Sequence, residues 1–268
     1  MNKKFKLGVI GGGFMATAII NGAINSDFLN KNELIVSDIS KTSLDKFANN
    51  GIATTTDNLV LASNAEFVLF AVKPQSIKDV LDTIKACNCD KFISIMAGVK
   101  KQRIKDVFVD AKVARCMPNT PCSISSGAIG LDVTDFDNAS DKEFVAKLLS
   151  SLATVVLVDE SKLNAVTGVS GSSPAYFYLF LKGIIESGVK QGLSEQESKT
   201  LAVATMIGAG KMVLQNQDKT LDDLINAVCS KGGTTIEAIN VFKQNNLDKI
   251  TDEAIDACVK RAFELENL

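Results

Sequence analysis

Hydrophobic residues follow two different patterns along this chain, and the change between them comes near residue 160. Before that point, short β-rich runs such as Phe67–Val72 alternate with segments of helical spacing such as Gln75–Ile84. Strands that alternate with helices are typical of a parallel sheet covered by helices on both faces. We therefore predict an α/β fold with a doubly wound sheet over residues 1–160. The predicted strands are Lys6–Ile10, Glu33–Asp38, Gly51–Thr54, Phe67–Val72, Phe92–Met96, Lys112–Cys116, Gly127–Val133 and Ala153–Val158.

Beyond residue 160 the strand pattern disappears, and residues 161–268 are predicted to form an all-α domain. A helix is expected to start at Ser172-Ser173-Pro174, because hydroxyl side chains cap helices and proline fits a first turn. Its apolar stripe from Phe177 to Ile185 is expected to pack in a core. The helix Ser194–Leu214 is rich in small residues and is expected to be buried centrally. Further helices are predicted at Leu221–Val228, Ile236–Lys243 and Asp248–Glu266, and the last ones are expected to cover another subunit.

The first predicted strand runs directly into three glycines, after which apolar residues resume at helical spacing. This order places Gly11, Gly13 and Ala16 at the positions of the dinucleotide-binding fingerprint. Gly11 permits the turn, Gly13 lets a pyrophosphate approach the backbone, and Ala16 lets the helix lie close to the strand. The helix start then offers free N–H groups and a positive dipole end to the phosphates. A purely structural glycine turn is the alternative.

Three more turns follow predicted strands, and in a doubly wound sheet ligands bind beyond the carboxyl ends of the strands. These turns are Ala71–Gln75, Met96–Val99 and Met117–Pro121. Asp38 ends the second strand about 25 residues after the glycines, where an acid binds the ribose hydroxyls of NAD(H) and repels a 2′-phosphate. The position slightly favours NADH unless Lys41 or a backbone turn compensates. Alternatively, Asp38 only caps the loop before Ser40.

Composition removes several classes of function. The formal net charge is −2 with no basic stripe, so nucleic acid is not an expected partner. The chain has no histidine, which excludes Ser-His-Asp triads and histidine metal cages, and no metal is expected. The six cysteines match no zinc or disulfide pattern, and most are expected to stay reduced and buried. No apolar run is long enough for a membrane span or a signal peptide, so a cytoplasmic protein is expected.

A second candidate anion site is the segment Ser230–Thr235, which leads into the helix at Ile236. Two glycines before a helix expose successive N–H groups, and hydroxyl side chains flank them. That arrangement suits a carboxylate. A helix break with threonine N-caps is the alternative.

Six motifs in this order resemble the pyrroline-5-carboxylate reductase family over essentially the whole chain. They are Ile10–Ala16, Ala71–Gln75, Ser94–Val99, Arg115–Pro121, Gly171–Tyr176 and Ser230–Thr235. The resemblance implies an N-terminal Rossmann domain that binds NADPH or NADH and a helical C-terminal domain that binds substrate and builds an intertwined homodimer, often assembled into a homodecamer. It implies reduction of the cyclic imine 1-pyrroline-5-carboxylate to L-proline, the last step of proline biosynthesis.

The same resemblance assigns the site residues. The substrate carboxylate is expected on Ser230 and the N–H groups of Gly232, Gly233 and Thr234, with Thr235 as the catalytic residue near the ring nitrogen. Asn58 is expected near the adenosine, and Met117-Pro118-Asn119 against the nicotinamide. The full set of expected cofactor-binding residues is Gly11, Gly13, Phe14, Met15, Asp38, Asn58, Val72, Lys73, Pro74, Ala97, Gly98, Met117, Pro118 and Asn119.

Two positions depart from the family pattern. Lys231 stands where the family has proline, which is expected to loosen the loop, and Ser173 stands at a family glycine, where it is expected to crowd the turn. The cofactor preference, the assembly size, any proline feedback and the use of another cyclic imino acid stay open. Two alternatives are a β-hydroxyacid dehydrogenase, for which Lys182 is the nearest catalytic lysine, and a non-catalytic NAD(P) sensor.

Overall fold

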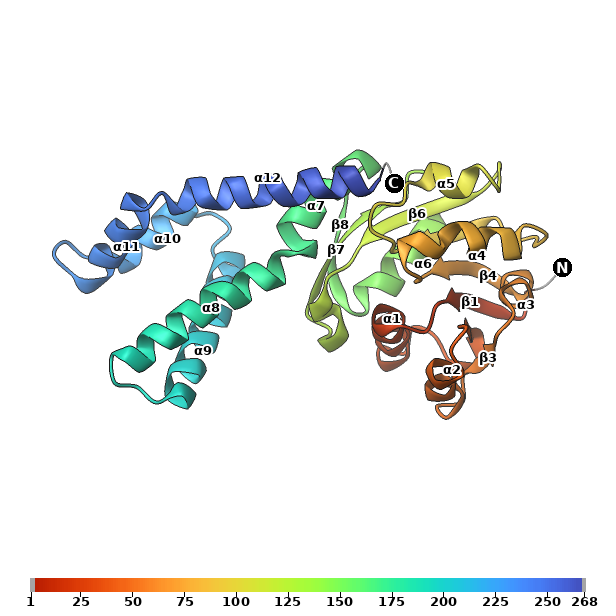
Figure 1. Cartoon of the computed structure of the whole chain (residues 1–268), viewed down its shortest axis with the longest axis horizontal. Coiled ribbons are helices and arrows are strands. Elements are labelled where there is room, and N and C mark those ends of the chain that lie inside the picture. Colours follow the sequence, from red (N-terminus) through yellow and green to blue (C-terminus); the bar gives the residue numbers. More distant parts are fainter. Residues whose placement is uncertain (1–2, 267–268) are drawn as a thin grey trace. The chain divides into compact units, whose positions relative to one another are not determined.

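A computed structural model describes residues 3–266, and the chain divides into two compact units. The first unit contains the chain up to Pro174 together with the segment that starts at Cys258. The second unit runs from Ala175 to Ala257. Two helices, α8 and α12, carry the chain from one unit into the other (Figure 1).

The first unit is built on an eight-stranded sheet in the order β3-β2-β1-β4-β5-β6-β7-β8. All eight predicted strands are present, with ends shifted by a few residues. Their bounds are β1 Phe5–Ile10, β2 Leu34–Ser37, β3 Ala53–Thr55, β4 Ala65–Phe70, β5 Lys91–Ser94, β6 Lys112–Met117, β7 Gly127–Asp132 and β8 Ala153–Leu157.

The sheet is mostly parallel, as predicted, but it contains one antiparallel pair that was not predicted from the sequence. The strands β1 to β6 pair in parallel, whereas β7 pairs antiparallel to β6 and parallel to β8. A parallel neighbour needs a crossover of about a dozen residues or more. Only the short 3-10 turn Thr120–Ile124 lies between β6 and β7, so the chain returns antiparallel.

Helices cover both faces of this sheet, as expected for a doubly wound fold. One buried cluster joins the sheet to α1, α2 and α6, through residues such as Ile19, Phe47 and Leu148. The other joins the opposite face to α3, α4 and α5, through Leu61, Leu81 and Ile104. The bounds of these helices are α1 Phe14–Asn25, α2 Lys41–Ala48, α3 Asn58–Asn64, α4 Ile77–Ile84, α5 Lys101–Lys105 and α6 Ala139–Ser150.

A short helix, α7 (Leu163–Val166), and a π-helical turn, Thr167–Gly171, precede α8. The start of α8 at Ser173 agrees with the prediction, but the predicted hydroxyl caps are wrong. The chain is already helical there, and the Ser173 hydroxyl donates back to the carbonyl of Val169. The crowding expected from this serine stays a prediction.

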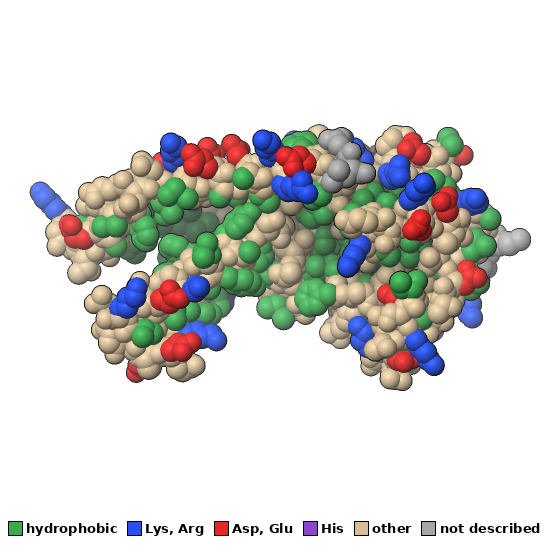
Figure 2. Space-filling model, in the orientation of Figure 1, with side chains coloured by type: hydrophobic (Ala, Val, Ile, Leu, Met, Phe, Trp, Pro, Cys, Tyr) green, Lys and Arg blue, Asp and Glu red, His purple; other side chains and the backbone are tan. Residues whose placement is uncertain are grey.

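The second unit is helical as predicted, but its apolar residues are not buried within one chain. Phe177, Phe180 and Ile184 are exposed, and along α9 only Ser198 and Ala202 are buried. Both the predicted core packing of the stripe and the central burial of α9 are therefore wrong for the single chain, because the two buried clusters belong to the first unit. Figure 2 shows hydrophobic side chains at the surface of this unit. Its elements are α8 Ser173–Lys190, α9 Glu195–Gln215, α10 Leu221–Val228, α11 Thr234–Gln244 and α12 Leu247–Leu265, with α8 and α12 shared between the units.

The last residues of the described chain are tied to the first unit by a buried charge network. Arg115, which is 1% exposed on β6, donates to Glu160 Oε1 at 3.1 Å and to Glu266 Oε1 at 2.9 Å. Among the described residues, no helix has both the length and the apolar character needed to cross a membrane.

Candidate functional site

The turn between β1 and α1 leaves its backbone open at the start of a helix. Gly11 has φ +100°, and a Cβ there would lie 2.7 Å from the carbonyl oxygen of Ala71, so the position requires glycine. Gly13 is the N-cap of α1, and a Cβ there would meet nothing within 4 Å. In the part of the chain that is described, no side chain caps this helix. The first N–H groups of α1 therefore face open space, which fits the pyrophosphate of a dinucleotide.

Asp38 braces this turn. Its Oδ2 accepts a hydrogen bond from the Gly12 N–H at 2.6 Å, and its Oδ1 accepts one from the Ser40 N–H at 2.7 Å. Gly12 is also enclosed from the side, because a Cβ there would lie 3.0 Å from Phe47 Cε2. The Asp38 carboxylate is thus fixed beside the turn between β1 and α1.

The other expected cofactor residues of the first strands follow the same edge of the sheet. β1, β4, β5 and β6 are parallel neighbours, so the turns that follow them lie at one edge. Val72, Lys73 and Pro74 follow β4, with Lys73 exposed and Pro74 opening a 3-10 turn. Phe14 opens α1 and is 61% exposed, whereas Met15 packs against the core.

Two expected cofactor residues are engaged in internal contacts. A Cβ on Gly98, in the turn after β5 that also holds Ala97, would lie 3.1 Å from the Leu265 side chain. Asn58, the first residue of α3, accepts from Ser37 Oγ at 2.7 Å and donates to Thr83 Oγ1 at 3.2 Å. Asn58 therefore links β2 to α4, and both positions carry structural contacts as well as the role implied by the resemblance.

Hydrogen bonds and packing contacts from neighbouring elements fix the loop Met117-Pro118-Asn119 at the end of β6. The Asn119 Nδ2 donates to the Ser170 carbonyl at 3.1 Å, and its Oδ1 accepts from the Ala128 N–H at 3.0 Å. Met117 is buried, and a Cβ on Gly171 would lie 3.4 Å from its Cγ. The loop is fastened to β7 and to the π-helical turn, a type of turn that is frequent at functional sites.

The charge network around Arg115 lies on the strand that leads into this loop. Burial by itself raises the pKa of the Glu266 carboxyl, but hydrogen bonds from Arg115 and Asn164 and the charges of Arg115 and Lys100 lower it below the usual value. Sequence reasoning missed this network. An arginine inside an otherwise apolar strand was the available signal, because a buried charge needs a partner.

In the second unit, Ser230–Thr235 forms a tight turn into α11. The Gly233 N–H donates to the Ser230 carbonyl at 3.0 Å, and Gly232 has φ +72°, which glycine adopts without strain. Gly233 is the N-cap of α11, and none of the described side chains caps the helix. Thr234 is therefore the first helical residue rather than a cap. The start of this 11-residue helix presents N–H groups with the Ser230 and Thr235 hydroxyls nearby in sequence, and of the expected donors the Gly233 N–H is already bonded to the Ser230 carbonyl and would have to exchange that bond for a ligand.

Lys231 is the second residue of this turn. A turn with positive φ at its third residue favours proline at the second. Lys231 occupies that second position, and the turn forms without proline there, so the expected loosening of the loop stays a prediction.

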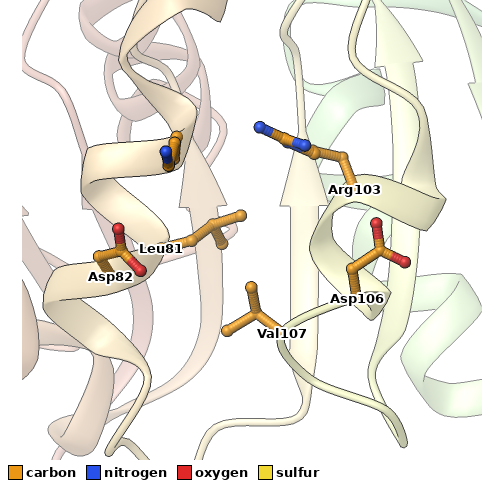
Figure 3. Close-up of a pocket in the computed structure, with 6 residues that line it drawn as sticks. Leu81, Asp82, Arg103, Asp106 and Val107 are labelled. Carbon is orange, nitrogen blue, oxygen red and sulfur yellow. The ribbon is translucent and has the colours of Figure 1, made fainter.

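A cavity of about 200 Å³ lies elsewhere in the first unit. Leu81 and Asp82 of α4 form one wall, and Arg103, Asp106 and Val107 of α5 and its C-terminal end form the other (Figure 3). These residues lie towards the C-terminal ends of their helices, away from the turns that begin at the carboxyl ends of the strands. This cavity is separate from the glycine turn.

Cys116, beside the loop at the end of β6, is made unreactive by its burial. Burial raises the pKa of the Cys116 thiol to about 12, so it stays protonated at neutral pH although it precedes Met117. Cys89, Cys116 and Cys122 are buried, whereas Cys87, Cys229 and Cys258 are partly exposed. The described residues contain no group of three or more Cys, Asp or Glu side chains placed to hold a metal ion.

Comparison with known proteins assigns the two parts of the chain to families. Residues 6–98 match the family model described as NADP oxidoreductase, coenzyme F420-dependent. Residues 160–265 match the model described as pyrroline-5-carboxylate reductase dimerisation.

Relatives match over nearly the full length. Pyrroline-5-carboxylate reductase of Haemophilus influenzae is 37% identical over 263 residues and covers 97% of both chains. A structure of the Coxiella burnetii pyrroline-5-carboxylate reductase has a TM-score of 0.90 at 32% identity, over 98% of this chain and 99% of that one. The Plasmodium falciparum pyrroline carboxylate reductase, crystallised with NADP bound, has a TM-score of 0.88 at 28% identity, over 99% and 100%. On these matches the chain belongs to the pyrroline-5-carboxylate reductase family.

Proposed function

We propose that this chain is a pyrroline-5-carboxylate reductase, which uses NAD(P)H to reduce the C=N bond of 1-pyrroline-5-carboxylate and so produces L-proline. The observation that carries the proposal is a pair of backbone anion sites, one in each unit. The first is the start of α1 at Gly13, and the second is the start of α11 at Gly233. The reaction needs one site for a dinucleotide and one for a small carboxylate.

The first site fits the cofactor by its shape. The Gly11 and Gly12 N–H groups are bonded to Ser37 and Asp38, so the donors left for a ligand are those from Gly13 onward, where an added Cβ would meet open space. Phe14, Met15, Val72, Lys73, Pro74, Ala97, Gly98, Met117, Pro118 and Asn119 are proposed to bind the cofactor around it, with Asp38 and Asn58 at its adenosine end. When bound, the reduced nicotinamide supplies a hydride.

The second site is proposed to bind the substrate carboxylate. Ser230 and the N–H groups of Gly232, Gly233 and Thr234 are its proposed donors, and backbone donors at a helix start are fixed before the substrate arrives. Thr235 is proposed as the catalytic residue, with its hydroxyl directed to the ring nitrogen. The substrate is then held at two points, its carboxylate and its ring nitrogen, and these two contacts orient the imine carbon.

The missing histidine is compatible with this chemistry. A cyclic imine is basic enough to be protonated before or during binding, and the iminium carbon then accepts hydride without a strong general acid. The protein's task is to orient the reactants and to exclude water. The Thr235 hydroxyl holds the N–H of the protonated ring, and the product nitrogen keeps that proton.

The assembly is proposed to be a homodimer formed by the second unit, with a homodecamer of such dimers as the larger form. The match to the dimerisation model and the exposed apolar residues of α8 and α9 support a homo-oligomer. Residues 1–160 are proposed as the cofactor domain and residues 161–268 as the substrate and dimerisation domain. A cytoplasmic location is proposed with them.

The alternatives lose support at particular residues. Lys182, the lysine that a β-hydroxyacid dehydrogenase would need, pairs with Glu186 on the same helix at 3.8 Å and remains exposed. A non-catalytic sensor has no use for the turn at Ser230–Thr235.

The test is a reaction with purified protein, 1-pyrroline-5-carboxylate and either NADH or NADPH. We expect loss of absorbance of the reduced cofactor together with formation of L-proline, identified by chiral chromatography. Binding of the cofactor with no proline formed from either cofactor would reject the reductase and favour the sensor.

A further inference from the structure

The loop between β2 and α2 contains a carboxylate that is unusually well fixed for a surface side chain. Asp38 accepts one backbone N–H on each oxygen, from Gly12 at 2.6 Å and from Ser40 at 2.7 Å. An ionised carboxylate offers about four acceptor positions, so about two stay available after these bonds. The group therefore presents a fixed negative charge and free acceptors beside the phosphate turn.

The residue that follows has no structural role in the first unit. Ile39 is 100% exposed, which is uncommon for isoleucine. Its neighbours in the loop, in contrast, are held by hydrogen bonds. Ser40 caps α2 by accepting from the Ser43 N–H at 3.3 Å. The loop thus combines fixed acceptors with a bare apolar side chain one residue away.

We propose that this loop makes the protein select NADH over NADPH, with Asp38 as the residue that determines the choice. The inference rests on the proposed function of the glycine turn as the cofactor site. The free acceptors of Asp38 suit the two ribose hydroxyls, and Ile39 offers an apolar surface to the adenine. The 2′-phosphate of NADPH places a second negative group beside the Asp38 carboxylate, which its two backbone hydrogen bonds hold in position.

The one nearby cation in the sequence of this loop is Lys41, at the first position of α2. It is exposed on a long flexible side chain, and a hydrated surface ammonium contributes little unless its geometry is fixed. Asp38 is fixed by two bonds. The repulsion therefore outweighs the attraction.

Direct binding measures the preference independently of catalysis. The chain has no tryptophan, so the fluorescence of the bound reduced nicotinamide can be titrated without that background. We expect NADH to bind at least about tenfold more tightly than NADPH to the wild-type protein, as a like-charge contact near a protein surface predicts. AMP is expected to compete better than 2′-AMP for the same site.

Two variants test the assignment to this loop. Asp38→Asn removes the charge but keeps only one acceptor for the two backbone N–H groups, whereas Ile39→Arg adds a cation at an exposed position and leaves the bonds of Asp38 in place. Both are expected to lower the NADPH-to-NADH ratio of dissociation constants by about tenfold. Val109→Arg is the matched control, because Val109 is 81% exposed before β6, away from the carboxyl edge of the sheet. That variant is expected to leave the ratio unchanged.

The proposal is overturned if wild-type protein binds NADPH as tightly as NADH or more tightly, or if neither loop variant changes the ratio. A preference for NADPH that disappears in Lys41→Met would assign the choice to the lysine instead, and would also overturn it. The proposed reductase activity is judged separately, because proline formation with either cofactor supports it whichever cofactor binds more tightly.

Discussion

Gly13 stands at the start of α1 with open space where a side chain would project, whereas Gly12 beside it is enclosed by Phe47 and Asp38. The spacing of Gly11 and Gly13 predicted the turn, but the enclosure of Gly12 by Phe47 and Asp38 could not be predicted from it. Gly13→Glu adds a negative side chain into the space proposed for the pyrophosphate. We expect the affinity for NADH to fall by at least about hundredfold, by repulsion and by occlusion.

The measurement for that variant is a fluorescence titration with NADH, supported by circular dichroism to show that the fold is kept. Gly13→Ala is the matched control, since a methyl group meets no atom within 4 Å and adds no charge. It should bind NADH far better than the glutamate variant. If wild type and Gly13→Glu bind NADH with equal affinity, the assignment of the pyrophosphate to this turn is rejected.

Thr235 lies in the first turn of α11, directly after the proposed carboxylate donors. Thr235→Ala is expected to lower kcat by about tenfold to hundredfold, because a hydrogen bond to a charged group contributes about 1.5–3 kcal/mol. Cofactor affinity should not change, because the cofactor is assigned to the other unit. Steady-state kinetics and an NADH titration measure the two effects.

Thr235→Ser serves as the control for that variant, since it keeps the hydroxyl and loses only a methyl group. Recovery of most of the activity in the serine variant supports a role for the hydroxyl. Unchanged kinetics in the alanine variant would leave Thr235 without a catalytic role.

At the scale of elements, the C-terminal turn of α12 depends on a buried ion pair with β6. The Glu266 carboxyl, whose pKa is lowered in the folded chain, binds Arg115 at 2.9 Å. Glu266→Gln leaves the Arg115 guanidinium with one charged partner fewer, so we expect about 1–3 kcal/mol loss in the free energy of unfolding at pH 7. Glu264→Gln is the control, because Glu264 pairs with Arg261 at an exposed site and should cost below about 1 kcal/mol.

The same carboxyl gives a pH dependence with a definite sign. Because the folded pKa is lowered, the unfolded state takes up the proton first as the pH falls. The stabilisation is therefore complete above the ordinary glutamate pKa of about 4.3 and is lost as the pH falls through the lower, folded value. Urea unfolding at pH 7 and in acid should show a smaller acid loss for Glu266→Gln than for wild type. An equal loss in both proteins would contradict the assignment.

Elements with a regular hydrophobic pattern could be predicted from the sequence. Features that depend on contacts between residues far apart in the chain could not. Most of the strands have short apolar runs, so they could be predicted from the sequence, whereas the short β3 contains two threonines. The antiparallel direction of β7 depends on the length of one connection, and the π-helical turn before α8 has no apolar period of its own. The Arg115–Glu266 pair joins positions far apart in the chain, so it could not be predicted. The hydrogen bonds of the Asn119 amide with Ser170 and Ala128 were likewise not predicted, and the expected place of Asn119 at the nicotinamide stays a proposal.

At the scale of the whole molecule, the second unit carries apolar side chains that the single chain leaves uncovered. This is why the stripe from Phe177 was predicted to lie in a core: the period is that of a buried helix, but a sequence does not say which chain buries it. Leu214 on α9 is 72% exposed. If a second copy covers it, Leu214→Lys removes about 1.5–3 kcal/mol of burial per copy and adds a charge.

That variant is expected to shift the protein from dimer or larger assembly towards monomer in sedimentation velocity runs over a range of concentrations. Val109→Lys, exposed in the first unit, makes the same kind of change away from the second unit and should leave the assembly as it is. A wild-type protein that sediments as a monomer at all concentrations would contradict the proposed dimer.

The claim on which the function depends is that the starts of α1 and α11 hold the two reactants of one reaction. A crystal structure of the protein with NAD⁺ and L-proline tests it most directly. We predict the pyrophosphate on the N–H groups that follow Gly13, and the proline carboxylate on those of Gly232, Gly233 and Thr234. The nicotinamide C4 should lie about 3–3.5 Å from a carbon bonded to the proline nitrogen. A structure with the proline carboxylate elsewhere, or with the Ser230–Thr235 turns of both subunits far from the nicotinamide, would contradict the account.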